Sequence, residues 1–170
     1  MTRTHTAQES ARVHNSQLVA TASTANFKLA RVGVTTSETE RTYAAEDAFE
    51  FEMPTRVLTL TEANDWLAMI AEAEGVDSPL VFKSKMSKSF VALAISTEWC
   101  IAVRESNPTQ LLLLHEMAHL LCANKNHGIE FRTEFVRLVR RYISFHHAAA
   151  LHAAFADHNL PMTSFASSAQ

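Results

Sequence analysis

The sequence predicts an α+β fold in which a small antiparallel sheet packs on a helix carrying His-Glu-Met-Ala-His and on a following long helix. Apolar residues recur at helical spacing in several segments, and short stretches of alternating side chains lie between them. Hydrophobic residues make up 47% of the chain, which has only three glycines and four prolines. At 170 residues the chain is long enough for one domain with its own core.

Three regions are expected along the chain. Residues 1–38 are polar and show little periodicity, which indicates a flexible arm, although residues 26–35 also suit a strand. Residues 39–160 are expected to form the domain. Residues 161–170 are expected to be a frayed tail, because the polar stretch after the last apolar run has little to pack against.

Two helices are predicted before the sheet. The acidic stretch 38–50 suits the first helix, with Tyr43 and Phe49 facing inward. Thr61 is the expected N-cap of the second helix, and Gly75 is expected to end it. The apolar stripe of the second helix has helical spacing and consists of Ala63, Trp66, Leu67, Ile70 and Ala71.

Three short stretches, 81–83, 89–96 and 99–104, are predicted to be strands. Within the last stretch small and polar residues alternate with larger apolar ones, so both faces are expected to be partly covered. The start of the next helix follows: Asn107 as N-cap, Pro108 at the first helical position and Gln110 at the capping-box position.

His115 and His119 of this helix are four residues apart, so both side chains lie on one face and suit one tetrahedral Zn²⁺ ion per chain. Glu116 lies beside them, where a carboxylate takes a proton from an attacking water as the general base. The helix is expected to end soon after His119, because Asn124 and Asn126 are suited to left-handed capping.

That turn brings His127 back as the third zinc ligand, and Gly128 is expected to remove side-chain bulk where the chain passes the metal. Three protein ligands with one open position are typical of a catalytic zinc site. Glu130 and Glu134 are competing carboxylates for the third position. Cys122 is a further candidate ligand, although a buried structural thiol is the favoured interpretation.

The motif His115-Glu116-Met117-Ala118-His119, a short connection and His127-Gly128-Ile129-Glu130-Phe131 resemble the H-E-x-x-H…H-G-x-x-F arrangement of SprT-like zinc metallopeptidases. They resemble even more closely small zinc metallohydrolases of actinobacteria and their phages. Those proteins have an upstream Y-x-A-E segment and a basic helix after the zinc site, which Tyr43-Ala44-Ala45-Glu46 and the arginines of residues 132–141 match. The resemblance covers roughly residues 38–145 and implies a mini-zincin fold.

The expected function is zinc-dependent hydrolysis, with a peptide or protein substrate favoured and the edge of strand 89–96 available to hold an extended peptide. The alternative is a zinc-stabilised module that binds nucleic acid or protein without turnover.

Nucleic-acid binding is not favoured. Arg132, Arg137, Arg140 and Arg141 are interleaved with glutamates on a chain of net charge −3, so a solvated helix face is the preferred interpretation.

The long helix after residue 128 is predicted from apolar residues at helical spacing, which are Phe131, Phe135, Leu138 and Tyr142. Tyr142 is expected to pack in the core rather than to stabilise an oxyanion. A terminal helix is expected over residues 148–156. The histidines around it are expected to form a solvated face rather than a second metal site, and they are His146, His147, His152 and His158.

Two cysteines are too few for a disulfide framework and suit a reducing compartment. No apolar run approaches the roughly 20 residues needed to cross a bilayer, and the polar N-terminus does not look like a signal peptide. A cytoplasmic protein without a membrane partner is therefore expected.

Overall fold

The computed structural model describes residues 37–85, 90–122 and 126–163, and within them it has five helices and a three-stranded sheet. The predicted α+β class is therefore confirmed. The predicted arm falls largely on residues 1–36, outside the described residues, but its last two residues already belong to the first helix. In chain order the elements are α2 (Ser37–Glu52), α3 (Leu60–Glu74), β1 (Leu80–Lys83), β2 (Ala92–Ile95), β3 (Cys100–Val103), α4 (Gln110–Leu121), α5 (Ile129–Tyr142) and α6 (Phe145–Asp157).

The sheet is mixed, with strand order β1-β3-β2. β2 and β3 form an antiparallel pair in which Ala92 lies opposite Val103, whereas β1 runs parallel to β3 with Leu80 opposite Cys100. The prediction of a purely antiparallel sheet is thus wrong for β1. A short connection forces the antiparallel direction on β2 and β3. The direction of β1 depends on its pairing with β3, which is not the next strand in the sequence. The side-chain pattern of a strand does not predict such a pairing.

The two faces of the sheet have different neighbours. Val81, Ile101 and Val103 point toward α3 and α4 and join the main hydrophobic core. The opposite face carries a small second cluster, which consists of Leu80, Phe82, Leu93, Ile95, Cys100 and Ala102. Both faces of β3 are therefore covered more completely than expected, since all four of its residues are buried.

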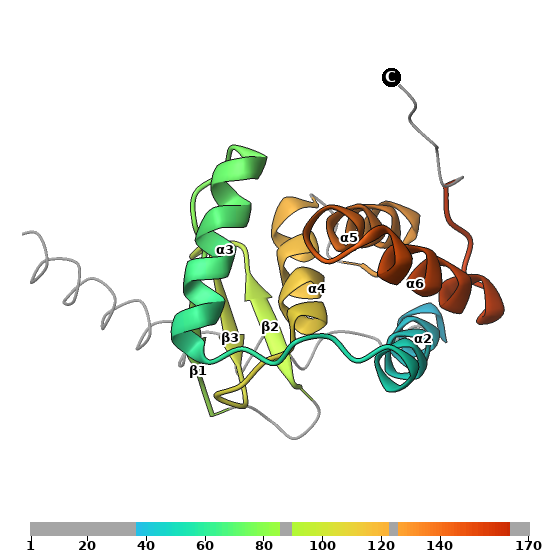
Figure 1. Ribbon diagram of the computed structural model, residues 1–170, viewed down its shortest axis with the longest axis horizontal. Coiled ribbons are helices and arrows are strands. Elements are labelled where there is room, and N and C mark those ends of the chain that lie inside the picture. Colours follow the sequence, from blue (N-terminus) through green and yellow to red (C-terminus); the bar gives the residue numbers. More distant parts are fainter. Residues whose placement is uncertain (1–36, 86–89, 123–125, 164–170) are drawn as a thin grey trace, which may run out of the picture.

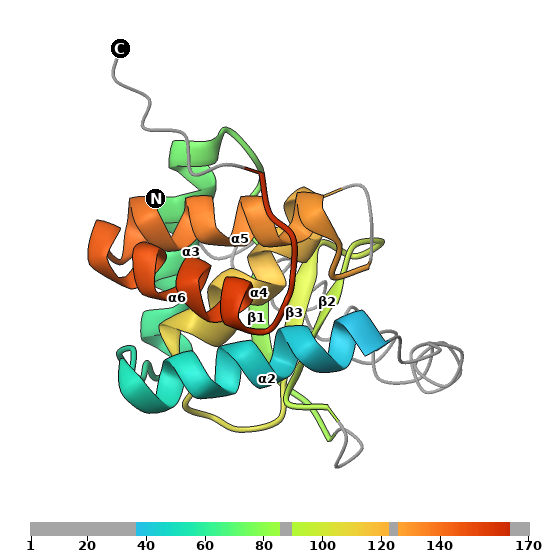
Figure 2. The same ribbon diagram turned by 90° about the vertical axis from the view of Figure 1, so that its right-hand side faces the viewer.

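Helix α4 lies at the centre of the molecule (Figure 1). It packs against β2, β3 and α3 on one side and against α5 on the other. Helix α6 packs against both α5 and α2, so α2 lies beside the last helix although it is first in the described chain (Figure 2). The expected contact of the sheet with α4 is confirmed, whereas the main neighbours of α5 are α4 and α6.

Two helices begin at residues other than those predicted. Helix α3 has Thr59 as its N-cap rather than Thr61, because Glu62 lies three residues after Thr59 and completes a capping box with it. Gly75 ends this helix in a left-handed conformation with φ 70°, as predicted.

Helix α4 has Thr109 as its N-cap, with the side chain accepting a hydrogen bond from the Leu112 amide, so Asn107 is not the cap. The reason is tertiary. The Pro108 carbonyl accepts a hydrogen bond from the Leu58 amide, and Thr109 forms a β-bridge with Val57. Pro108 is thereby held in an extended segment, and the helix starts after it.

The prediction that the arginines of α5 form a solvated face is wrong for Arg132, whose side chain is fully buried. Arg137 and Arg141 both pair with Glu74 of α3, at 2.7 and 2.9 Å. Tyr142 packs against the core, as predicted, and its hydroxyl also donates a hydrogen bond to Glu74 at 2.6 Å. These contacts join α5 to α3.

The tail is held to the fold at its beginning. The Pro161 carbonyl accepts a hydrogen bond from Arg132 at 2.7 Å, and the hydroxyls of Thr163 and Thr133 lie 2.9 Å apart. Residues 161 and 163 therefore contact the fold, while residues 164–170 lie outside the described residues. Among the described residues, none of the helices has the length and apolar character that crossing a membrane requires.

Candidate metal centre

Three histidine side chains meet at one point between α4 and the start of α5. His115 and His119 lie one turn apart on α4, and His127 lies in the segment just before α5. The Nε2 atom of His127 is 3.1 Å from the Nε2 atom of His115 and 3.1 Å from that of His119. His115 and His127 are buried and His119 is partly buried, and their ligand atoms all lie within 4.8 Å of one another.

This spacing fits a single metal ion. Around tetrahedral zinc, with Zn–N bonds of about 2.0–2.1 Å, two ligand nitrogens lie about 3.3–3.4 Å apart. The three histidines are therefore close enough to bind one metal ion. Imidazole ligands suit zinc, copper, iron and nickel, so the ligand set narrows the choice of metal without fixing it.

The other candidate ligands, Glu130, Glu134 and Cys122, do not belong to the cluster of the three histidines. Both carboxylate oxygens of Glu134 accept hydrogen bonds from Arg137, at 2.6 and 2.8 Å, and Glu130 is exposed on the outer side of α5. Cys122 ends α4 in an extended conformation. Asn126 has no positive φ, so the left-handed capping expected of it is wrong, and Asn124 lies outside the described residues. Burial, and then the charges of Glu134 and Glu130, raise the pKa of the Cys122 thiol to about 11.

A carboxylate from another helix fixes the orientation of His115. Nδ1 of His115 donates to Oε2 of Glu46, on α2, at 2.9 Å. With the proton on Nδ1, the lone pair of Nε2 is free to face the metal position. Such carboxylate–histidine pairs orient metal ligands and make them more basic.

The ring of Phe131 contacts all three histidine rings of the cluster. It stacks on His119 with a centroid distance of 4.3 Å and lies edge-on to His115 and His127 at 4.9 and 4.8 Å. The predicted apolar face of α5 therefore supports the ligands directly as well as contributing to the core.

The electrostatic surroundings favour neutral imidazoles at two positions. Burial, and then the charges of His115 and His127, lower the pKa of His119 to about 2. Burial, the charge of His115 and that of Arg132 lower the pKa of His127 to about 3. At His115 burial lowers the pKa, but the charge and hydrogen bond of Glu46 outweigh it and the net shift is upward. Because metal ligands must be deprotonated, protons compete with a metal ion more at His115 than at His119 or His127.

Glu116 lies beside the cluster and is 5% exposed. Burial of its carboxyl raises the pKa, and this effect outweighs the charge of His115 and a hydrogen bond from the Ala94 backbone, which both lower it. The Ala94 amide is on β2, so the neighbouring strand fixes the carboxylate. A carboxylate next to the ligands with a raised pKa has the properties of a general base.

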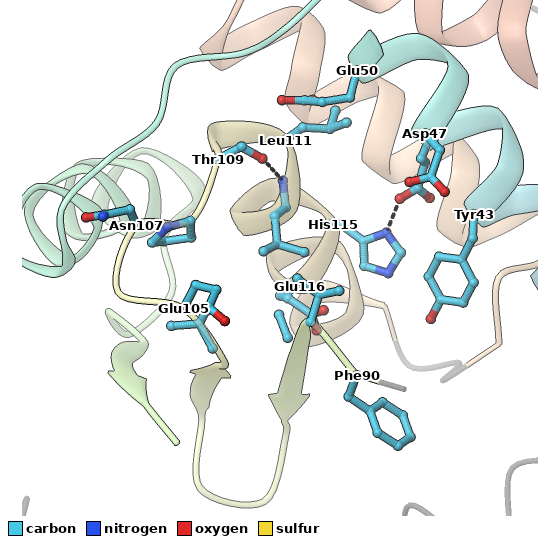
Figure 3. A pocket seen from close by; sticks show the side chains of 16 residues that line it. Tyr43, Asp47, Glu50, Phe90, Glu105, Asn107, Thr109, Leu111, His115 and Glu116 are labelled. Atoms are coloured by element: carbon cyan, nitrogen blue, oxygen red, sulfur yellow. Dashed lines mark hydrogen bonds and ion pairs between the residues drawn. The ribbon is translucent and has the colours of Figure 1, made fainter. Parts of the chain in front are cut away.

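A cavity of about 400 Å³ opens in front of His115 and Glu116 (Figure 3). Tyr43 of α2 points into it and is 45% exposed, so the prediction that this side chain faces inward is wrong, whereas Phe49 is buried as predicted. The Tyr43 ring stacks on His115 with a centroid distance of 5.8 Å and meets His127 edge-on at 4.9 Å. Burial, and then the charges of Glu116 and Glu46, raise the pKa of Tyr43 to about 12.

The backbone at His127 is held by the buried guanidinium of Arg132. One nitrogen, Nη1, donates to the His127 carbonyl and also to Glu38 of α2 at 2.8 Å, and the other, Nη2, donates to Pro161. Arg132 therefore joins the segment that carries the third histidine to both ends of the described chain.

The role expected for Gly128 is not found. Its φ is −73°, and a Cβ atom built at this position meets no other atom within 4 Å. It is the N-cap of α5 without a side-chain cap, so neither crowding nor backbone conformation requires glycine here.

The histidines around α6 do not form a second group with metal-binding geometry within the described residues. His147 contacts the Ser144 hydroxyl at 2.7 Å and lies edge-on to Phe49, while Nδ1 of His158 donates to the Ala154 carbonyl. The solvated face expected for these histidines is found at His146, which is exposed, whereas His147 is partly buried and contacts the N-cap residue Ser144.

The structure brings His115, Glu116, His119 and His127 together, and it adds residues to which sequence reasoning gave no role. These are Tyr43, Glu46, Phe131 and Arg132. A signal for the first two was present, because both belong to the Y-x-A-E segment of the resemblance and lie three residues apart on one helix. Comparisons with models of known protein families, with curated proteins and with solved structures give no match.

Proposed function

We propose that this protein is a zinc-dependent hydrolase that cleaves peptide bonds. The observation that carries the proposal is the meeting of three histidine side chains at one point, with one of them, His115, lining the same cavity as the Glu116 carboxylate. Three protein ligands leave the fourth tetrahedral position open, which is typical of catalytic rather than structural zinc. The resemblance to SprT-like zinc metallopeptidases supports the same chemistry.

Zinc bound at this site would supply a Lewis acid that lowers the pKa of water toward about 7 and polarises a carbonyl oxygen. The chain itself supplies the proton transfers. Glu116 takes a proton from the attacking water and delivers it to the nitrogen of the leaving amine. The Ala94 amide holds the carboxylate beside His115 while it does so.

Within the described residues, one edge of the sheet is open to an extended substrate. β2 is an edge strand, and the Arg104 amide donates to the Val91 carbonyl at 2.9 Å. Hydrogen-bonded pairs alternate along an antiparallel ladder, so Ala92 and Ala94 direct their backbone groups away from β3. The Ala94 amide meets Glu116, and Ala92 lines the cavity. A peptide that adds to this edge would therefore lie beside the proposed general base.

The alternative is a zinc-stabilised module that binds nucleic acid or protein without turnover. The contacts of α5 do not favour a phosphate-binding surface, because Arg132 is buried and Arg137 and Arg141 pair with Glu74. The helix face that suggested nucleic-acid binding is thus largely occupied by contacts within the fold.

The test is cleavage of a proteome-derived peptide library by zinc-loaded protein, with Glu116→Gln as the matched control. We expect cleavage by the wild type, and a loss of at least about a hundredfold in the variant with its zinc retained. Equal cleavage by both proteins would contradict the proposal. Retained zinc without cleavage by the wild type would favour the binding module, and loss of zinc in the variant would make Glu116 a ligand.

A further inference from the structure

We propose that Tyr43 is a catalytic residue, whose hydroxyl donates a hydrogen bond to the carbonyl oxygen of the scissile bond as that oxygen gains negative charge. The inference rests on the proposed function and deepens it, because it assigns the stabilising donor of the same site. Hydrogen-bond donors aimed at a developing oxyanion are among the largest contributions to catalysis of acyl transfer.

Helix α2 holds Tyr43 in place through a second contact with the same site. Tyr43 and Glu46 are three residues apart, so their side chains leave the helix on the same face. Glu46 accepts the hydrogen bond from Nδ1 of His115 and is 12% exposed as a side chain. This anchors the helix over the candidate metal centre and leaves Tyr43 beside it, on the side of the cavity.

The ring of Tyr43 contacts two of the three candidate ligands, His115 and His127, with centroid distances of 5.8 and 4.9 Å. Its hydroxyl end points into the cavity, on the opposite wall from Glu116 (Figure 3). A substrate carbonyl that approaches the histidine cluster from the cavity would therefore lie between the proposed general base and this hydroxyl.

The chemistry of the cavity wall singles out Tyr43 as a donor near the histidines. Glu46 and Glu116 accept hydrogen bonds when ionised, and the apolar residues that line the cavity donate none from their side chains. Asn107 and Thr109 also line the cavity, but they lie at the start of α4. Thr109 lies six positions before His115, which corresponds to a rise of about 9 Å along the helix.

In the proposed step the water oxygen bonds to the carbonyl carbon, and the π electron pair of the carbonyl moves onto its oxygen. Tyr43 donates a hydrogen bond to that oxygen and keeps its proton. Glu116 accepts the proton of the water and passes it to the amide nitrogen as the carbon–nitrogen bond breaks. The products are a carboxylic acid and an amine, so no further reactant is needed.

The test compares Tyr43→Phe with Tyr142→Phe, which changes the other of the two tyrosines of the chain. Tyr142 donates to Glu74, away from the cavity, and serves as the matched control. We expect Tyr43→Phe to lower kcat by about a hundredfold or more with little change in KM. Zinc content should remain that of the wild type. Affinity for a phosphinic peptide, whose tetrahedral oxygens mimic the oxyanion, should fall by a similar factor, while affinity for a product peptide should not.

Each other outcome overturns the assignment in a distinguishable way. Equal kcat and equal phosphinic-peptide affinity in the wild type and Tyr43→Phe would make Tyr43 a packing residue. Loss of zinc in Tyr43→Phe would make its contacts with His115 and His127 the main role. A wild type that binds zinc but neither cleaves peptides nor binds the phosphinic peptide would overturn the proposed function together with this inference.

Discussion

The carboxylate of Glu46 on α2 lies 2.9 Å from Nδ1 of His115 on α4. The two residues are 69 positions apart in the chain, yet this contact decides which nitrogen of His115 carries the proton. The first helix of the described chain therefore sets the orientation of a ligand on the central helix.

Removing this partner should weaken metal binding. We expect Glu46→Ala to lower zinc affinity by about 10–100-fold, the usual effect of losing a hydrogen-bond partner of a metal ligand. Glu46→Gln should lose less, because its amide oxygen still accepts from Nδ1. Competition with a chromophoric chelator measures the affinity, and Asp47→Asn, on an exposed neighbour, is the control. Unchanged affinity in Glu46→Ala would mean that ring packing alone orients His115.

Arg132 should be required for the stability of the fold. Arg132→Met leaves the carbonyls of His127 and Pro161 without their donor, so we expect a loss of about 2–4 kcal/mol in the free energy of unfolding, measured with urea. Glu38→Gln is the control, with a loss below about 1 kcal/mol, because the Glu38 side chain is 41% exposed. Equal small losses in both variants would show that the buried guanidinium does not hold the His127 segment.

Much of the fold could be predicted from the sequence where local patterns agree with the tertiary structure. The apolar stripe of α5 and the glycine cap of α3 depend on helical spacing and on a positive φ at Gly75, and both were predictable. The parallel direction of β1 and the displaced start of α4 depend on neighbours distant in sequence. The extended conformation at Thr109, for example, accompanies a β-bridge with Val57 and a hydrogen bond from the Leu58 amide to the Pro108 carbonyl.

The candidate site divides in the same way. The spacing of His115, Glu116 and His119 on one helix predicts their proximity, and the short return of the chain predicts that of His127. The spacing of Tyr43 and Glu46 places both on one helix face, but their roles depend on the packing of α2 against α6 and on its contact with the cavity, which that spacing does not predict. Arg132 looked like a surface residue because its helix carries other charges. Its burial depends on partners from residues 38 and 161.

Glu74 should stabilise the contact between α3 and α5 in a pH-dependent way. Burial raises the pKa of its carboxyl, but hydrogen bonds from Arg137 and Tyr142 and the charges of Arg137 and Arg141 outweigh this, so the net pKa lies below 4.5. The Glu74 carboxyl is therefore protonated more readily in the unfolded chain than in the folded chain. The stabilisation is present above about pH 4.5 and is lost as the pH falls through the folded-state value.

Glu74→Gln should therefore have a free energy of unfolding about 1–3 kcal/mol lower than the wild type at pH 7, as measured by urea unfolding. This difference should shrink below pH 4.5. Glu72→Gln, on an exposed neighbour in the same helix, should change little at either pH. A difference between wild type and Glu74→Gln that stays constant from pH 7 to pH 3 would contradict the role given to the ionised carboxylate.

Gly128 should tolerate a side chain, against the expectation from the sequence. Its φ of −73° suits any residue, and a Cβ atom meets nothing within 4 Å. Gly128→Ser supplies a hydroxyl to the uncapped start of α5, so we expect the stability to be unchanged or raised by a few tenths of a kcal/mol. Thermal unfolding of the zinc-free protein measures this. A clear loss of stability would show that the glycine is needed for a conformation other than the one described.

The metal content of the purified protein tests the central claim most directly. Wild type, His127→Ala and Glu130→Ala are purified without chelators, equilibrated with excess zinc, dialysed and measured by elemental analysis. Because three imidazoles meet within 4.8 Å, we expect about one zinc ion per chain in the wild type and in Glu130→Ala, and a large loss in His127→Ala. A wild type without bound zinc, or a His127→Ala variant that retains the full amount, would contradict the account.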